Sequence, residues 1–378
     1  MKPLLLVSTG DDDADFLYAT RFPVEESFYF RFEDGDDLLM VPTLELGRAK
    51  EVTIAKQVID RREAGWEESR DTLAEWAKAA AAVLSKRKVD NIRISPRLPV
   101  VYYEALKAAG VQLEIDKELL QAERRSKSRE EASFIHSAQR AAEAACAEVI
   151  SHLAVAEVSE GMLWLDGRPL TSERLMAKAQ AALNEIGYTT PDMIVAGSPG
   201  CALPHFRGAG QIRAHAPVII DIYPRGTNSH YHGDLTRTVV AGEIPPEIQR
   251  MYDTSVQALD AGIALIKAGV NGRDVHLAAC QILVDGGYGT STKGYEGNQA
   301  GPVMIHSLGH GVGLAAHEAP SIRDLDYRLE ANDVVSVEPG LYKVGLGGVR
   351  VEDTGLVTAE GFKNFTSLPR SLDPRAYL

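Results

Sequence analysis

Residues 217–241 read PVIIDIYPRGTNSHYHGDLTRTVVA and contain two apolar runs separated by turn-forming residues. These runs predict two strands, near 217–223 and 231–241. Asp221 interrupts the first run after three aliphatic residues, and Asp234 stands at the start of the second. A carboxylate on a buried strand is costly unless an opposite charge meets it. The segment therefore predicts two strands on which both acids face an opposite charge.

The same situation recurs downstream. Glu338 follows the run Val334-Val335-Ser336-Val337, and Glu352 lies in Val349-Arg350-Val351-Glu352. Between the two pairs of acids, residues 306–320 read HSLGHGVGLAAHEAP. Four acids on apolar strands and one imidazole form the ligand set of a two-metal site for Mn²⁺, Co²⁺ or Zn²⁺.

Each of these signals has an ordinary structural explanation when it is taken alone. An acid at a strand end is commonly solvated or ion-paired, and a Gly-His-Gly sequence is commonly a tight turn. Arg237 and Arg350 are explained as ion-pair partners of nearby acids. The joint pattern, with two acid pairs in matching β segments, favours a functional site.

Around these segments the order of predicted elements occurs twice. Two helices and then three strands are predicted at 129–152, 172–187, 193–196, 217–223 and 231–241. The same order follows at 246–268, 273–285, 303–307, 333–338 and 348–357. Residue-level similarity between the halves is not visible, so element order alone predicts a duplicated α/β domain.

The first part of the chain has a different character. Strands are predicted at 4–8, 28–32, 38–41, 91–94 and 111–115, and helices at 72–88 and 99–109. A charged helical pattern then covers 118–152. We therefore expect an α/β (α+β) protein with an N-terminal mixed α/β domain over 1–122 and a C-terminal duplicated domain over 123–378.

Composition limits the class of protein. The 378 residues include 53 acids and 40 Lys plus Arg, for a net charge of −13, which argues against nucleic acid or an anionic membrane as partner. Three dispersed cysteines without a CxxC pair fit a reducing compartment. The apolar run Leu4–Val7 is too short for a secretory signal, and longer apolar stretches are interrupted by charges. A soluble cytoplasmic protein is expected.

Four motifs together resemble the metallopeptidases of the pita-bread fold, which include methionine aminopeptidase, aminopeptidase P and prolidase. They are DIYPRGTNSHYHGDLTRT (221–238), HSLGHGVGLAAHEAP (306–320), SVEPGLY (336–342) and VRVED (349–353). The preceding domain favours the Xaa-Pro branch over methionine aminopeptidase. Creatinase shares the two-domain layout but lacks the full metal set. The resemblance implies five metal ligands, with Asp234 and Glu352 bridging both ions: Asp221, Asp234, His310, Glu338 and Glu352.

The resemblance also implies a substrate site formed by His205, His306, His317 and Arg350. Glu338 is the candidate general base. His317 and His205 are expected to donate hydrogen bonds to the developing oxyanion, and His306 to lie at the rim of the proline pocket. For Arg350 two roles stay open, because it could steady the bridging carboxylate or meet a substrate carboxylate.

The implied activity is metal-dependent hydrolysis of the Xaa-Pro bond, with dipeptides favoured over longer peptides. Two divalent ions are implied, Mn²⁺ first and Co²⁺ or Zn²⁺ as alternatives. Short proline-containing peptides are the expected partners, and a homodimer is the expected assembly, with the N-terminal domain closing the site within one chain or across the dimer. The alternatives are hydrolysis of another small amide and a non-catalytic binding relative. The second predicts missing ligands, and none is missing.

One stretch departs from the family pattern. Asp221 and Asp234 lie 13 residues apart, two more than expected, and Tyr223 stands where glycine is usual. A longer hairpin is expected to absorb the difference without moving either acid. Whether His230 or His232 reaches the substrate stays open.

Overall fold

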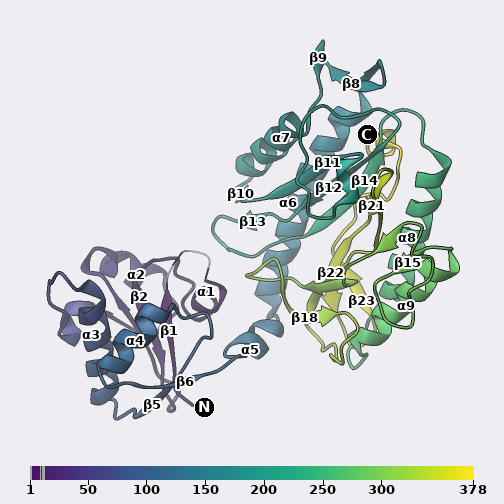
Figure 1. The fold of residues 1–378 in the computed structure, drawn as a ribbon. Helices are drawn as coiled ribbons and strands as arrows, with labels where there is room; N and C mark the ends of the chain where they lie inside the picture. The colour runs from purple at the N-terminus through teal and green to yellow at the C-terminus, as the bar shows by residue number, and fades with distance from the viewer. Residues whose placement is uncertain (1, 9, 11–12) are drawn as a thin grey trace. The chain divides into compact units, whose positions relative to one another are not determined.

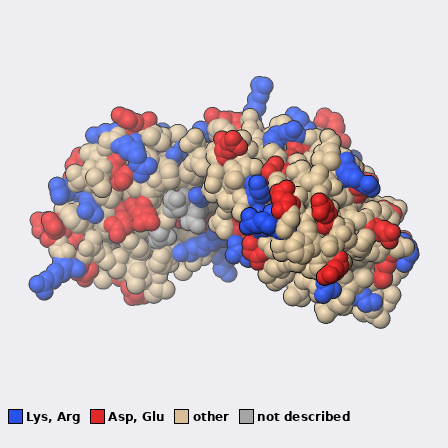
Figure 2. Space-filling model, turned by 90° about the horizontal axis from the view of Figure 1, so that it is seen from above, with Lys and Arg blue, Asp and Glu red and all other residues tan. Residues whose placement is uncertain are grey.

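The computed structural model describes residues 2–8, 10 and 13–378, and the chain divides into two compact units, Met1–Arg124 and Arg125–Leu378 (Figure 1). Both units mix helices with sheets, so the α/β class expected from the sequence is confirmed. Acidic and basic side chains are interspersed over the face drawn in Figure 2. Within the described residues, every helix is too short or too polar to cross a bilayer.

The first unit is built on a six-stranded mixed sheet with the strand order β4-β3-β2-β1-β5-β6. Its strands are β1 (Leu4–Ser8), β2 (Ser27–Arg31), β3 (Asp37–Val41), β4 (Gln57–Asp60), β5 (Asn91–Ile94) and β6 (Gln112–Ile115). Its helices are α1 (Ala14–Thr20), α2 (Leu46–Val52), α3 (Thr72–Lys86), α4 (Val100–Ala108) and α5 (Gln121–Arg125), the last of which ends one residue into the second unit.

Alternation along β1 explains why this sheet is covered on both faces. Leu5 and Val7 belong to one buried cluster, together with Trp76 of α3, whereas Leu4 and Leu6 belong to another. Successive side chains of a strand point to opposite faces, so an uninterrupted apolar run indicates a sheet buried on both sides.

The second unit repeats one arrangement. In its first half, helices α6 (Arg129–Ala154) and α7 (Ser172–Glu185) precede an antiparallel sheet, β11-β12-β14. In its second half, α8 (Pro246–Leu265) and α9 (Gly272–Asp285) precede a sheet with the order β18-β17-β19-β22-β23. Each half encloses its own apolar core. The duplicated α/β architecture is therefore confirmed.

The strands of the two main sheets are short. They are β11 (Met193–Gly197), β12 (Pro217–Ile222), β14 (Leu235–Val240), β17 (Gly309–Gly311), β18 (Glu318–Ile322), β19 (Val334–Val337), β22 (Asp353–Val357) and β23 (Phe362–Asn364). Smaller sheets join β7 (Glu157–Ser159), β8 (Met162–Leu165) and β9 (Arg168–Pro169); β10 (Tyr188–Thr189) and β13 (Arg225–Gly226); and β15 (Gly289–Thr290), β16 (Val303–Met304), β20 (Gly340–Lys343) and β21 (Gly347–Arg350). Short 3₁₀ helices cover Thr43–Glu45, Arg61–Ala64, Gly200–Ala202 and Pro374–Tyr377.

Two elements that were predicted as continuous are each divided in the structure. The strand expected over 348–357 is two strands, because β21 pairs with β20 whereas β22 pairs with β19, and the chain changes sheet at Val351 and Glu352. The helical pattern over 118–152 is also divided. Ser128 and Glu131 form a capping box that starts α6 anew after α5 has ended.

Candidate functional site

The first pair of acids lies on the sheet of the first half. Asp221 is on the central strand β12, opposite Ile194 of β11 on one side and Thr236 of β14 on the other. Asp234 immediately precedes β14 and is almost fully buried. The long connection from 223 to 234 contains β13, which pairs with β10, and leaves both acids at the same cavity. The inserted residues are therefore accommodated outside the hairpin's paired strands.

The second half brings its residues to the same place. His310 lies on β17, Glu338 directly follows β19, and Glu352 lies where the chain passes from β21 to β22. They face a cavity of about 540 Å³. All nine residues predicted for the site line this cavity: His205, Asp221, Asp234, His306, His310, His317, Glu338, Arg350 and Glu352.

The ring of His310 is oriented by the backbone. Its Nδ1 lies 3.1 Å from the carbonyl oxygen of Gly311, which can only accept, so Nδ1 carries the proton. Burial acts to lower the pKa of His310, but the hydrogen bond and charge of Glu338 raise it, so Nε2 also carries a proton here and offers a lone pair to the cavity once that proton is lost. Nε2 lies 3.6 Å from Oδ2 of Asp234 and 3.4 Å from Oε1 of Glu338. A carbonyl that fixes the imidazole in this way is the usual support of a metal-ligating histidine.

The buried carboxylates lack sufficient positive charge around them. Burial and the charges of neighbouring carboxylates raise the pKa of Asp221, Asp234 and Glu352, and the pKa of Glu352 reaches about 8. Burial also acts to raise the pKa of Glu338, but its hydrogen bond with His310 and the His310 charge bring that pKa down to about 2. Oε1 of Glu352 is buried and has no hydrogen-bond partner among the described residues.

These observations fit a divalent cation. One donor atom from each of Asp234, His310 and Glu352 lies within 4.8 Å of the other two. Carboxylate oxygens and an imidazole nitrogen are ligands for Mn²⁺, Co²⁺ and Zn²⁺. A bound cation would also give the unpaired oxygen of Glu352 a partner and offset the repulsion among the acids.

Arg350 is buried and holds two of the carboxylates. Its Nη2 is ion-paired with Asp221, and its Nε lies 3.2 Å from Oγ1 of Thr236. The Thr236 hydroxyl in turn donates to Oε2 of Glu352 at 2.9 Å. In this structure Arg350 therefore steadies Asp221 directly and Glu352 through Thr236.

A hydrogen-bonded chain extends from Arg350 to His306. Nη1 of Arg350 donates to the Tyr342 hydroxyl at 2.8 Å, and that hydroxyl lies 2.9 Å from Nε2 of His306. Nδ1 of His306 lies 2.8 Å from the Ser307 carbonyl, so Nδ1 carries the proton and Nε2 accepts from Tyr342. Burial lowers the pKa of His306, which favours this neutral form.

His205 and His317 reach the cavity from loops. His205 follows the 3₁₀ helix Gly200–Ala202, and His317 directly precedes β18, with its ring centroid 4.1 Å from that of His310. Burial and the charge of the nearby His310 together lower the pKa of His317 to about 4, so the ring is neutral near pH 7. A neutral imidazole can still donate one hydrogen bond.

Buried polar groups behind the cavity hold the strands in place. The side chain of Gln139 on α6 accepts from the backbone N–H of Asp234 and donates to its carbonyl, both at 2.9 Å. Arg237, which is fully buried, donates to the Glu352 carbonyl at 2.6 Å and pairs with Asp353 at 3.0 Å. The explanation of Arg237 as an ion-pair partner is therefore confirmed.

Several cavity residues were not identified from the sequence: Asp192, Ile194, Arg207, Tyr223 and Ser307 line the cavity, and Tyr342 supports it. In the sequence, Tyr223 was noted only because it departs from the family pattern. It lines the cavity, whereas His230 and His232, for which contact with the substrate was left open, are not among the lining residues. Burial raises the pKa of Tyr223, and the charges of Asp192 and Asp221 raise it further. Asp192 carried no local signal.

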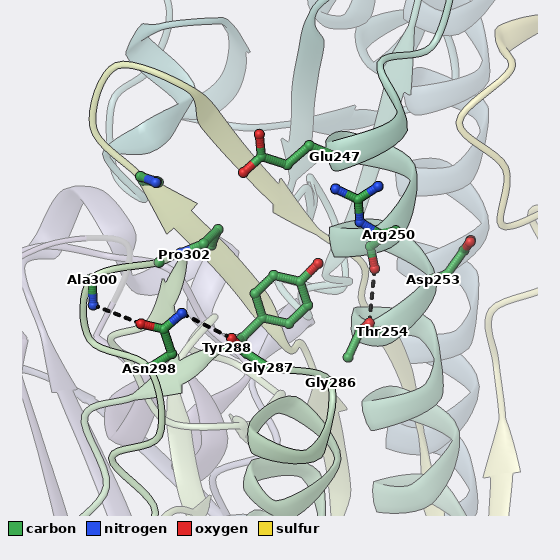
Figure 3. Close-up of a pocket in the computed structure, with 12 residues that line it drawn as sticks. Glu247, Arg250, Asp253, Thr254, Gly286, Gly287, Tyr288, Asn298, Ala300 and Pro302 are labelled. Carbon is green, nitrogen blue, oxygen red and sulfur yellow. Dashed lines mark hydrogen bonds between the residues drawn. The ribbon is translucent and has the colours of Figure 1, made fainter.

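A separate pocket of about 510 Å³ lies in the same unit (Figure 3). Glu247, Arg250 and Asp253 approach it from α8, and Tyr288 stands at its centre. None of the nine predicted residues lines it. The nine predicted residues are therefore gathered in one of the described cavities.

Comparison with known proteins agrees with this geometry. The sequence profile of metallopeptidase family M24 matches residues 133–359. An Xaa-Pro dipeptidase of Pyrococcus furiosus is 34% identical over 224 residues, which span 58% of this chain and 58% of that relative. An Xaa-Pro dipeptidase of Lactobacillus delbrueckii is 28% identical over 94% of this chain and 91% of its own length. The crystal structure of a prolidase from Pyrococcus horikoshii superposes with a TM-score of 0.80 at 26% identity and covers 98% of this chain and 95% of that one.

Proposed function

The chain belongs to metallopeptidase family M24, and we propose from this premise that it hydrolyses the Xaa-Pro peptide bond and releases the N-terminal residue. Dipeptides are the favoured substrates over longer peptides. The similarity to two Xaa-Pro dipeptidases supports Xaa-Pro peptides as the substrate class. The observation that carries the proposal is the convergence of nine predicted residues from both halves of the second unit on one cavity.

We propose that Asp221, Asp234, His310, Glu338 and Glu352 would hold two divalent ions. Mn²⁺ is the first candidate and Co²⁺ or Zn²⁺ the alternatives. The raised pKa of Glu352 and its unpaired Oε1 support a cation at this point. When bound, the ions supply an acidified water and an electrophile for the carbonyl oxygen.

The chain's own residues then perform four tasks. Glu338 accepts the proton of the attacking water and delivers it to the leaving proline nitrogen. His317 and His205 donate hydrogen bonds to the carbonyl oxygen as negative charge develops there, a contribution of about 3 kcal/mol where such donors have been removed from other enzymes. Arg350 holds Asp221 in position. His306, fixed by Tyr342, lies at the rim of the proline pocket.

An Xaa-Pro bond has no N–H on the proline nitrogen. Selectivity must therefore come from the shape of the pocket that receives the ring and from the groups that meet the two ends of the peptide.

Three substrates assayed side by side with added Mn²⁺ test the proposal: an Xaa-Pro dipeptide, an Xaa-Pro tripeptide and an N-acetyl amide. We expect the dipeptide to be hydrolysed fastest. A faster tripeptide would assign the chain to the aminopeptidase side of the branch. Turnover of the amide alone would favour hydrolysis of another small amide, and binding without turnover of any would favour the non-catalytic alternative.

We further propose a cytoplasmic homodimer in which the first unit is the N-terminal domain of the Xaa-Pro branch. The buried free thiols of Cys146, Cys201 and Cys280 support a reducing compartment. Light scattering on the purified chain tests the dimer, which predicts about twice the 41.0 kDa chain mass.

A further inference from the structure

One side of the catalytic cavity carries an ion pair that the proposed mechanism does not use. Asp192 and Arg207 both line the cavity and are paired with each other. Their side chains remain 42% and 58% exposed, so both are within reach of a ligand. The other charged side chains that line the cavity have been assigned to the metal site or to its support.

The strand register explains how this pair comes to the cavity. In the β11–β12 ladder, Ile194 lies opposite Asp221 and Met193 opposite Ile222, so the next step brings Asp192 beside Tyr223. Residues two apart on a strand share a face, which puts Asp192 with Ile194 and Tyr223 with Asp221. The backbone N–H of Val195 donates to the carbonyl of Arg207 at 2.9 Å, which brings Arg207 to the same edge.

The pair lies on the opposite side of Asp221 from the metal-supporting network. Thr236 lies across from Asp221 on β14, and Arg350 and Glu352 are bonded to Thr236. A dipeptide whose carbonyl lies at the acid cluster extends in two directions. The rim residue His306, which lies on the Arg350 side of the acid cluster, suits the proline end, so the β11 side is left for the Xaa side chain.

We propose that the Asp192–Arg207 ion pair selects the Xaa side chain by charge, a role that rests on the proposed Xaa-Pro peptidase function. As a pair the two groups present little net charge, so uncharged side chains are accepted. A charged Xaa side chain must displace the like-charged member of the pair before it can bind the oppositely charged member. This displacement costs binding free energy.

Single substitutions that leave one member unpaired test this role. Asp192→Asn leaves the guanidinium of Arg207 alone, and Arg207→Gln leaves the carboxylate of Asp192 alone. The measurement is kcat/KM for Ala-Pro, Glu-Pro and Lys-Pro with the Mn²⁺-loaded full chain. Relative to the wild type, we expect Asp192→Asn to raise the Glu-Pro to Lys-Pro ratio about fivefold and Arg207→Gln to lower it about fivefold, as suits half-exposed charges. The matched control is Arg207→Lys, which keeps the pair and should keep the wild-type ratio.

If the pair had a purely structural role, the two substitutions would change the Glu-Pro to Lys-Pro ratio in the same direction or leave it unchanged. Shifts in the same direction, or shifts below twofold, while Ala-Pro is still hydrolysed would overturn the charge-selection role and leave the proposed function intact. A change in the dipeptide to tripeptide ratio without a change in the charge ratio would also overturn it, because the pair would then face the other end of the substrate. Failure of the wild type to hydrolyse any Xaa-Pro peptide would instead remove the proposed function itself.

Discussion

Glu352 is the residue whose environment makes least sense without a cation. It is 2% exposed, its Oε1 has no partner among the described residues, and other carboxylates surround it. A buried acid in such a place destabilises the protein by itself. The residue is therefore better explained by what it binds than by what it contributes to folding.

Glu352→Gln should stabilise the metal-free protein and weaken its affinity for metal. The amide keeps the shape and the acceptor for Thr236. Because the pKa of Glu352 is raised to about 8, folding at pH 7 requires the carboxylate to take up a proton, and the amide avoids this cost, so we expect the metal-free protein to gain about 1–3 kcal/mol. The rise in melting temperature on adding Mn²⁺ should become smaller, because a ligand is lost. Thermal melts with and without Mn²⁺ measure both effects. Glu247→Gln on the exposed face of α8 is the control, and a variant with an undiminished Mn²⁺ response would contradict the assignment.

Tyr342→Phe tests the chain of hydrogen bonds behind the site. The substitution removes the acceptor for Arg350 and the donor for His306, and an unsatisfied buried guanidinium costs about 1–3 kcal/mol. We expect kcat/KM to fall between tenfold and hundredfold while bound Mn²⁺ is unchanged, since Tyr342 is not a proposed ligand. Tyr295→Phe, outside the cavity, is the matched control. An unaltered kcat/KM would show that the network does not position Arg350.

At the residue scale, the sequence was informative where a charge interrupts an apolar run. Asp221, Glu338 and Glu352 could be identified because nothing in a strand core explains an acid. Asp192 could not, because it precedes its strand in an ordinary polar stretch and meets Arg207 only through folding. Tyr342 lies inside a quoted motif, but its partners are distant in sequence.

At the element scale, helix α6 holds the main chain of a residue that lines the cavity. Gln139 is fully buried and bonds to both backbone groups of Asp234. A proposed ligand is thus positioned through its main chain by a helix that begins at Arg129, more than 100 residues earlier.

Gln139→Leu should loosen this support. Thr354 still donates to the Asp234 carbonyl at 2.8 Å, but the Asp234 N–H loses its partner, at a cost of about 1–3 kcal/mol. Mn²⁺ affinity should fall about 10–100-fold, the range found when groups supporting a ligand are removed. Denaturant melts and Mn²⁺ titration measure the two effects, and Gln281→Leu, at an exposed position of α9, is the control. Equal Mn²⁺ affinity in the variant and the wild type would rule out the positioning role.

Gly309→Ala tests how closely β17 approaches β19. A Cβ at this position would lie 2.0 Å from the Ser336 carbonyl oxygen, so the strands must separate. Because His310 follows directly, we expect loss of bound Mn²⁺ and a destabilisation of about 1–3 kcal/mol. The control is Gly47→Ala, because a Cβ added at Gly47 would have no neighbouring atom within 4 Å. Gly345 is not suitable, since its φ of +87° would strain an alanine. A variant with wild-type stability and Mn²⁺ content would contradict this close packing.

At the element scale, the predicted strands were located well but their ends were not. The apolar pattern over 348–357 continues through Val351, yet the chain changes sheets there because β21 and β22 have different partners. Pairing partners are long-range and leave no mark in local alternation. The capping signal at Ser128 and Glu131, by contrast, is local and was available in the sequence.

For the whole molecule, all residues proposed to bind metal belong to the second unit. Mn²⁺ should therefore slow hydrogen exchange in β12, β14, β17 and β19 far more than in β1 and β5. Hydrogen-exchange mass spectrometry of the full chain, with and without Mn²⁺, measures this difference. Equal slowing in both units, or none in the second, would contradict the assignment.

The duplicated order of elements could be predicted at this scale, because each half repeats two helices followed by strands. The two-unit division could be anticipated from the change of character near residue 122, and the compact units meet between Arg124 and Arg125. The convergence of both halves on one cavity could not be derived from periodicity. It depends on how the two sheets pack.

The central claim is that five residues hold two divalent ions and that the chain then cleaves an Xaa-Pro bond. Metal content and proline release from Ala-Pro, measured on the same sample before and after loading with Mn²⁺, test it most directly. We predict two ions per loaded chain, proline release only after loading, and loss of both in Asp234→Ala and Glu352→Ala. A fully loaded chain that leaves Ala-Pro intact, or variants with unchanged metal content, would contradict the account.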